Sequence, residues 1–196
     1  MKHKSLGQDL VRALASRKYE LTGDGVAFPT LNVEVVGEYF HSVNGGPVTV
    51  DKNILTTEFL NYLLMCGLHT LPKVNDWYLT LFAGNVTPAT NWKAETFTSA
   101  ASEIVSSTEG YTQANRVKFN ATATNSNQVD NLVGGRAQFT IVTASQLVVR
   151  GAALLSDQLK GSTQGLLASA SRFTRERTLL DGDTFDLGYR VTLNAV

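Results

Sequence analysis

Residues 76–85 constrain the fold more than any other part of the chain. Their bulky side chains alternate between two sets, Trp77, Leu79 and Leu81 in one and Tyr78, Thr80 and Phe82 in the other. Because successive side chains of a strand point to opposite faces, this pattern predicts a strand that is covered on both faces. Aromatic and β-branched residues favour the conformation, and the Gly84-Asn85 pair predicts its end. Such a strand belongs in a sheet core or in an assembly, and not at a free edge.

The charge of the chain restricts the kinds of partner that it can have. Lys and Arg number 17, as do Asp and Glu, so the net charge is zero. Charged residues make up 17% of the chain, below the roughly 25% that is typical of soluble domains. Nucleic-acid recognition usually needs a basic stripe, so we expect no nucleic-acid partner. A net charge of zero also does little to keep copies apart, and we expect a protein that packs against neighbours.

The cysteine count and the apolar runs give expectations about location. The single Cys66 cannot form an internal disulfide and falls in an apolar helical pattern, which is typical of a buried thiol. We therefore expect the chain to fold in a reducing cytoplasm. Residues 1–5 do not open an apolar segment of signal-peptide length, so we expect no secretory signal. No apolar run reaches the length of a membrane span, and we expect no membrane partner.

Residues 1–25 are predicted to form an N-terminal arm or a short helix. Three leucines at helical spacing make an amphipathic stripe, namely Leu6, Leu10 and Leu14. Ser5 is a suitable N-cap for this helix. The basic residues of the segment leave nucleic-acid or membrane contact as an alternative, but an arm that docks its leucine stripe on its own domain or on a neighbour is the favoured interpretation.

Residues 26–196 are predicted to form a single β-rich domain. Short strand patterns recur about every eight to twelve residues with turn signals between them, which indicates an antiparallel β-sandwich or a jelly-roll-like domain. Residues 56–70 are the one substantial helix, with Thr56 or Thr57 as the cap and Pro72 as the stop. Residues 94–101 are compatible with one further helical turn, and residues 175–177 are interpreted as a charged connection between strands.

No group of residues in the sequence indicates catalysis, a cofactor or a metal. The histidines are dispersed and no zinc or phosphate-binding motif is present. The Asp-Gly-Asp run at residues 181–183 suggests calcium, but it does not match an EF-hand loop and a tight turn explains it. Glu103 and Glu109 are interpreted as solvated side chains. We therefore predict a protein that is not an enzyme.

Several segments together resemble a group of tailed-bacteriophage virion proteins. The resemblance lies in residues 55–58 at the start of the helix, 77–82, 109–111 with Arg116, 139–141, 150–152, 182–185 and 188–189. It runs from about residue 50 to the C-terminus and rests on hydrophobic alternation and turn glycines. The resemblance implies a jelly-roll cement or decoration subunit of the capsid, without catalytic residues.

A virion protein of this kind would bind the major capsid protein or other virion proteins, and would form a homo-oligomer within a symmetric assembly. It would be made and folded in the host cytoplasm. The contact residues predicted for it are Leu6, Leu10, Leu14, Trp92 and Phe97. Two alternatives stay open: a tail, neck or fibre-adaptor component, and a carbohydrate-binding jelly-roll module with an exposed tryptophan.

Overall fold

The computed structural model describes residues 8–9, 11–12, 15, 19–29, 33–122 and 126–195. The chain divides into two compact units, one of Met1–Glu34 with Leu193–Val196 and one of Val35–Thr192. The boundary predicted after residue 25 falls inside the smaller unit. No helix within the described ranges is long and apolar enough to cross a membrane.

The smaller unit contains a β-hairpin. Strand β1 (Tyr19–Leu21) pairs antiparallel with β2 (Ala27–Pro29). The turn between them uses Gly25 at a φ of 78°, a conformation that favours glycine. Four large apolar side chains of this hairpin are exposed: Tyr19, Leu21, Val26 and Phe28. Three leucines of the predicted contact stripe lie outside the described residues: Leu6, Leu10 and Leu14.

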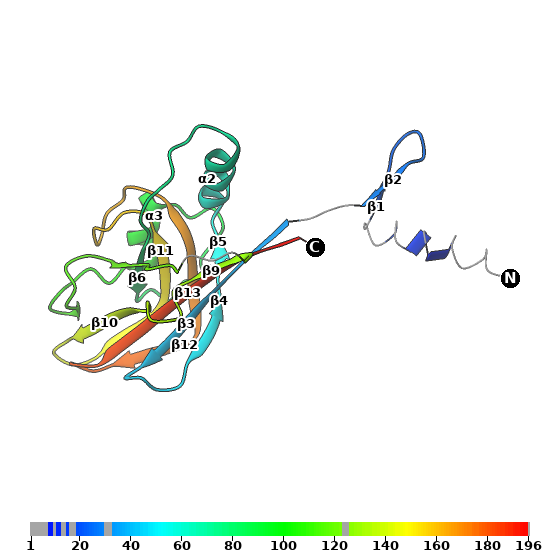
Figure 1. Ribbon diagram of the computed structural model, residues 1–196. Coiled ribbons are helices and arrows are strands. Elements are labelled where there is room, and N and C mark those ends of the chain that lie inside the picture. Colours follow the sequence, from blue (N-terminus) through cyan, green and yellow to red (C-terminus); the bar gives the residue numbers. More distant parts are fainter. Residues whose placement is uncertain are drawn as a thin grey trace. The chain divides into compact units, whose positions relative to one another are not determined.

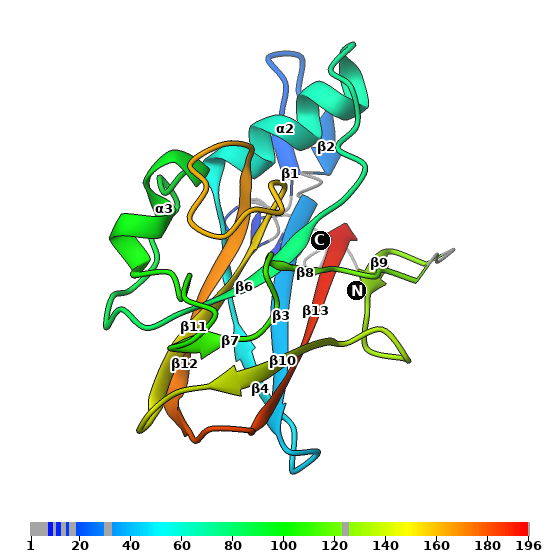
Figure 2. The same cartoon turned by 90° about the vertical axis from the view of Figure 1, so that its left-hand side faces the viewer.

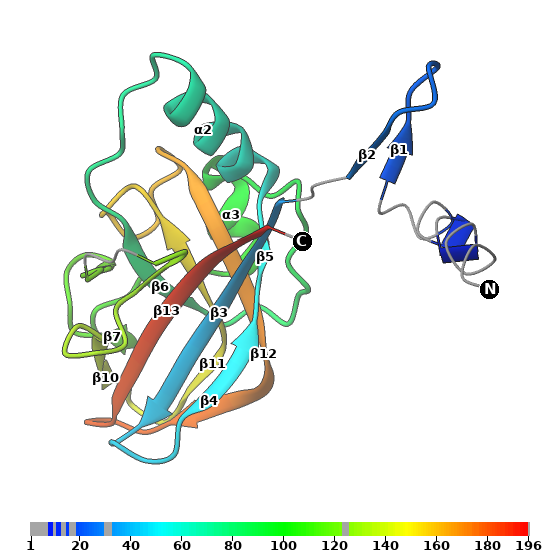
Figure 3. The same ribbon diagram turned by 45° about the vertical axis from the view of Figure 1, so that its right-hand side comes forward.

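Two antiparallel sheets build the larger unit (Figure 1). In the first sheet the strands follow the order β4 (Thr49–Lys52), β3 (Val33–Val43), β13 (Thr184–Ala195), β10 (Ala137–Val142) and β7 (Gly110–Tyr111), and β9 (Gln128–Asp130) also pairs with β13. In the second sheet the order is β5 (Ile54–Leu55), β12 (Leu167–Leu179), β11 (Leu147–Leu155), β6 (Tyr78–Phe82) and β8 (Val117–Lys118). Figure 3 shows β3, β4 and β13 side by side in front of β11 and β12.

Side chains of both sheets share one hydrophobic core. Phe139 and Phe185 of the first sheet belong to the same buried cluster as Leu79, Leu81 and Phe173 of the second. A second cluster lies on the other face of β6, β11 and β12, where Phe82 packs with residues of helix α3 (Ala94–Ala101). Strand β6 is therefore covered on both faces, as its alternating sequence predicts.

Helix α2 (Thr57–Leu68) confirms the helix predicted over residues 56–70. It lies at the end of the larger unit opposite the β3–β4 and β12–β13 turns in each view (Figures 1 to 3). The short helix α3 occupies residues 94–101, where a helical turn is compatible with the sequence. Residues 175–177 are not a connection, since they lie within β12. That prediction was wrong because Glu176 bonds to Arg150 of β11 and Arg177 to Thr49 of β4, which lets the charged run stay within the sheet.

Candidate functional site

The N-terminal end of α2 is fixed to neighbouring elements by two polar side chains. The Thr56 hydroxyl accepts the Phe59 N–H at 3.1 Å and donates to the carbonyl of Leu167, so it caps the helix. The Glu58 carboxylate accepts the backbone N–H groups of Leu167 at 2.7 Å and of Ala94 at 3.1 Å. The helix is therefore attached to the starts of β12 and α3, which sets its orientation.

The inner face of α2 packs on aromatic residues. Phe59 and Tyr62 are buried, and both rings contact Trp77 edge-on with ring centroids 5.5 and 5.8 Å apart. The Tyr62 hydroxyl accepts the Val74 N–H at 2.7 Å, which ties the segment after the helix back to it. An apolar hollow of about 420 Å³ lies beside this face, and Phe119 is among its lining residues. The hollow offers hydrophobic contact and few hydrogen bonds.

The outer face of α2 carries large apolar side chains that the described chain leaves partly or mostly exposed. They follow helical spacing and continue past its C-terminus: Leu60, Leu64, Met65, Leu68 and Leu71, here named the α2 ridge. Leu64 is 61% exposed and Leu68 is 85% exposed. Single exposed apolar residues are common, but a contiguous group on one surface marks a site of interaction. The α2 ridge is the strongest candidate for a contact surface.

A hollow of about 400 Å³ lies at the N-terminal end of α2. Its lining residues are Thr57, Glu58, Asn61, Asn91, Trp92 and Lys93, and we name it the Trp92 hollow. The Trp92 ring is half-buried and meets Phe97 edge-on, with centroids 6.4 Å apart. Phe97 itself is fully buried in the cluster under α3. Its predicted role as a contact residue is therefore corrected, because its own domain covers the ring.

A buried ion pair joins Glu103 to Arg116. The guanidinium donates from Nε and Nη2 to the two carboxylate oxygens at 2.7 and 2.8 Å. Glu103 also accepts the hydroxyls of Thr80 and Thr98, each at 2.8 Å, and the Gly161 N–H at 3.0 Å. The prediction of a solvated Glu103 was wrong, because the fold supplies a partner for each oxygen. Such compensation is what a buried charge requires.

The same network holds the loop that precedes β12. Arg116 donates from Nη1 to the Asp157 carbonyl at 3.0 Å and from Nη2 to the Ser162 carbonyl at 3.2 Å. Lys160 donates to the carbonyl of Tyr111 at 2.9 Å, and its ammonium lies 3.6 Å from the centroid of that ring. Burial lowers the pKa of Lys160 to about 8. The polar atoms of Glu103, Arg116 and Lys160 are therefore used to fix this loop on the sheet. We interpret the cluster as stabilising the fold and not as binding a ligand.

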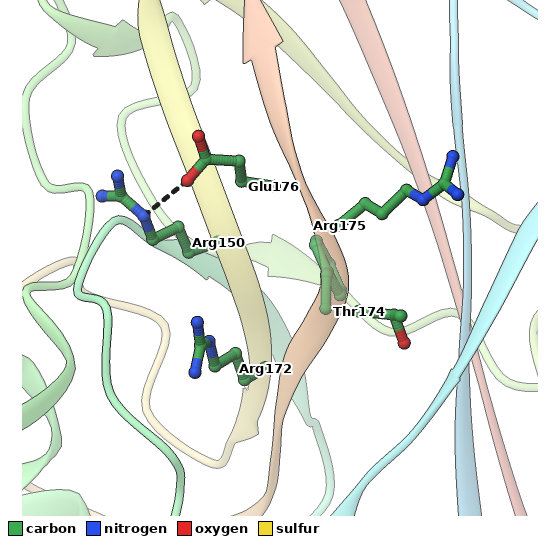
Figure 4. Close-up of a pocket in the computed structure, with 6 residues that line it drawn as sticks. Arg150, Arg172, Thr174, Arg175 and Glu176 are labelled. Carbon is green, nitrogen blue, oxygen red and sulfur yellow. Dashed lines mark hydrogen bonds and ion pairs between the residues drawn. The ribbon is translucent and has the colours of Figure 1, made fainter.

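An irregularity in β12 opens a shallow arginine-lined hollow of about 330 Å³. Residues 173–176 of β12 lie opposite the single Arg150 of β11, since Val149 pairs with Arg177 and Gly151 with Arg172. Arg150 donates to Glu176 at 2.8 Å and to the Ala83 carbonyl at 2.7 Å. Figure 4 shows Arg150, Arg172 and Glu176 on one side of β12, with Thr174 and Arg175 on the other. Because Glu176 neutralises the charge of Arg150, the surface of this hollow is exposed but only partly positive.

His41 and Asp51 form a second buried polar pair, on the other side of the same irregularity. His41 Nε2 lies 2.9 Å from an Asp51 oxygen, and the other oxygen accepts the Thr174 N–H at 2.8 Å and its hydroxyl at 2.6 Å. The imidazole is fully buried and stacks on Phe173 with centroids 4.0 Å apart. Its Nδ1 has no hydrogen-bond partner among the described residues. This arrangement fits a neutral imidazole that donates from Nε2.

We expect the buried His41–Asp51 pair to make the folded domain less stable in mild acid. Burial lowers the pKa of His41, and the hydrogen bond to Asp51 offsets this only in part. The unfolded chain binds a proton near pH 6.5 and the folded chain does not, so the free energy of unfolding falls as the pH drops below about 6.5, by up to about 1.4 kcal/mol per pH unit. Urea unfolding at several pH values between 8 and 5 measures this dependence on pH. At each pH the free energy of unfolding is extrapolated linearly to zero urea.

Two variants separate His41 from the other titrating groups. His41→Gln keeps an amide donor for Asp51 and removes the titration, so its stability should change less than that of the wild type over this pH range. His69→Gln alters an exposed histidine and should keep the full pH dependence. Equal slopes for the wild type and His41→Gln would contradict the assignment. Burial alone would raise the pKa of Asp51, but hydrogen bonds from Thr174 and His41 lower it, so the effect of Asp51 falls at lower pH.

Comparisons with protein-family models, with curated proteins and with solved structures find no match to this chain. Among the residues that the structure describes, no three His, Cys, Asp or Glu side chains are placed to hold a metal ion. The exposed surface features described above include the α2 ridge, the hairpin residues and the Trp92 hollow.

Proposed function

We propose that this chain is a non-enzymatic structural protein of a tailed-phage virion, and that it stabilises the capsid as a cement or decoration subunit. Its antiparallel sheets and shared core are compatible with the jelly-roll or sandwich class that the sequence resemblance implies. The partner is the major capsid protein or another virion protein, and further copies of the chain belong to the same symmetric assembly.

The α2 ridge is the observation that carries the proposal. A helix whose inner face is buried and whose outer face still holds leucines at 61% and 85% exposure is typical of a surface that another protein covers. Burying one such leucine contributes about 1.5–3 kcal/mol. Because a capsid repeats each contact many times, modest contacts add up to a stable shell. The N-terminal end of α2 is bonded to β12 and α3 and the inner face of the helix packs on Trp77, so the ridge is presented in a defined orientation.

The exposed hairpin gives secondary support for a protein that binds its neighbours. Tyr19 and Leu21 lie on one face of the β1–β2 ribbon and Phe28 lies on the other, because Phe28 is opposite Glu20. All three are exposed. A two-stranded ribbon is only marginally stable alone, and apolar side chains on both faces suit a segment that is stabilised by contact with another protein.

Copy number tests the proposal. Quantitative mass spectrometry of purified virions should find this chain in numbers comparable to those of the major capsid protein. A ring-like number at a single vertex would instead favour the alternative, a tail, neck or fibre-adaptor component. Absence of the chain from purified particles would reject both virion roles.

A further inference from the structure

The walls of the Trp92 hollow are held in place by hydrogen bonds from three backbone N–H groups. The Thr57 N–H donates to the carbonyl of Thr90 at 2.8 Å, and the Trp92 N–H donates to the carbonyl of Ala89 at 3.0 Å. The Ala94 N–H donates to Glu58 at 3.1 Å. The bonds of Thr57 and Glu58 connect α2 with the segment around the start of α3, and the Trp92 bond fixes the turn within that segment, so the two walls have a fixed separation. A preformed site of this kind loses little freedom when a ligand binds.

The chemistry of the lining combines one aromatic face with several free polar groups. Trp92 is half-buried and braced by Phe97, which leaves part of the indole open to the hollow. The side-chain amides of Asn61 and Asn91 and the hydroxyl of Thr57 are exposed, and they make no hydrogen bond within the part of the chain that is described. Each amide offers both a donor and an acceptor, which matches the paired hydroxyl groups of a sugar ring.

We propose that the Trp92 hollow binds a neutral pyranose residue of a polysaccharide. The apolar C–H face of the sugar stacks on Trp92, because the negative face of an aromatic ring attracts partly positive C–H groups. The amides of Asn61 and Asn91 bind the ring hydroxyls from the sides. The hollow, at about 400 Å³, falls within the roughly 300–1,000 Å³ that is typical of small-ligand sites.

The lining favours a sugar over a protein side chain. A protein contact centre is usually an aromatic anchor surrounded by apolar residues, as the α2 ridge would provide. In the hollow, every lining residue other than Trp92 is polar or charged. One carboxylate and one ammonium, Glu58 and Lys93, balance each other, and Glu58 is already bound to two backbone N–H groups. A neutral ligand therefore fits better than an anion or a cation.

Tryptophan fluorescence gives a direct test, because the chain has two tryptophans. In a Trp77→Phe background Trp92 is the only tryptophan. Methyl glycosides of glucose, galactose and N-acetylglucosamine, and short β-linked oligomers of the same sugars, are the probes. At least one should shift the Trp92 emission saturably with a Kd of about 1 mM or lower. No change with any probe at about 10 mM, well above that Kd, would overturn the proposal.

Calorimetry on the full-length chain with the sugar that binds best then assigns the residues. Trp92→Ala should weaken binding about tenfold or more, whereas Trp92→Phe keeps a stacking surface and should stay within about threefold. Asn61→Ala and Asn91→Ala should each weaken binding roughly three- to tenfold. Asn75→Ala is the matched control outside the hollow and should have no effect. Unchanged sugar binding by a folded Trp92→Ala, or release of this variant from virions, would assign Trp92 to a protein contact and overturn the proposal.

Discussion

Replacing Arg116 by methionine is expected to lower the free energy of unfolding by about 3–5 kcal/mol, the usual cost of removing one partner from a buried ion pair. Both side chains are fully buried, so Glu103 would keep its charge away from water without its strongest partner. The loop would also lose its bonds from Arg116 to the carbonyls of Asp157 and Ser162. For a chain of this size the change corresponds to a fall in Tm of about 6–20 °C.

The matched control is the exposed pair of Arg150 with Glu176. Its side chains are 30% and 55% exposed, so Glu176→Gln should change stability by about 1 kcal/mol or less. Urea and thermal unfolding of the two variants give the comparison. If Arg116→Met is as stable as Glu176→Gln, the buried network does not hold the loop as described above.

Introducing aspartate at Leu64 and Leu68 together is expected to remove binding to the capsid without harming the fold. Both side chains are mostly exposed, and surface substitutions usually change stability by about 0.5 kcal/mol or less. At a contact centre the loss of a large apolar side chain costs about 2 kcal/mol or more, which is roughly 30-fold in Kd. A buried, unpaired carboxylate adds to that penalty. Co-sedimentation with capsids that lack the chain measures the effect.

Val133 provides a control for the ridge variant. It is 86% exposed, close to the 85% of Leu68, but it lies between β9 and β10 and not on α2. Val133→Asp should therefore bind as the wild type does, and circular dichroism should show both variants folded. Equal binding by the wild type and the Leu64→Asp, Leu68→Asp variant would exclude the ridge as the contact surface.

Local patterns in the sequence were enough to predict the helices and strands that are determined by the spacing of nearby side chains. The alternation in residues 77–82 predicted a strand covered on both faces, and Leu79 and Phe82 do lie in different hydrophobic clusters. The Thr56 cap, the apolar run and Pro72 predicted helix α2. Such features follow from the side-chain period and from capping, which act over a few residues.

The candidate sites depend on contacts between distant segments, and the sequence did not reveal them. Helix α2 is apolar on both faces, so its pattern did not show that Phe59 is buried while Leu64 is exposed. The pairing of Glu103 with Arg116 depends on the sheet that brings them together, and no local spacing indicates it. Phe97 was assigned to a surface because its neighbours are polar, yet α3 turns its ring into the core.

The side-chain environment of α2 in the intact particle tests the central proposal most directly. A cryo-EM map of purified virions, at a resolution that shows side chains, should place the chain in many symmetry-related copies. In that map Leu64 and Leu68 should be buried against another protein. A chain that is present on the shell with its α2 ridge facing solvent would contradict the proposed contact, and a chain missing from the particle would contradict the proposed function.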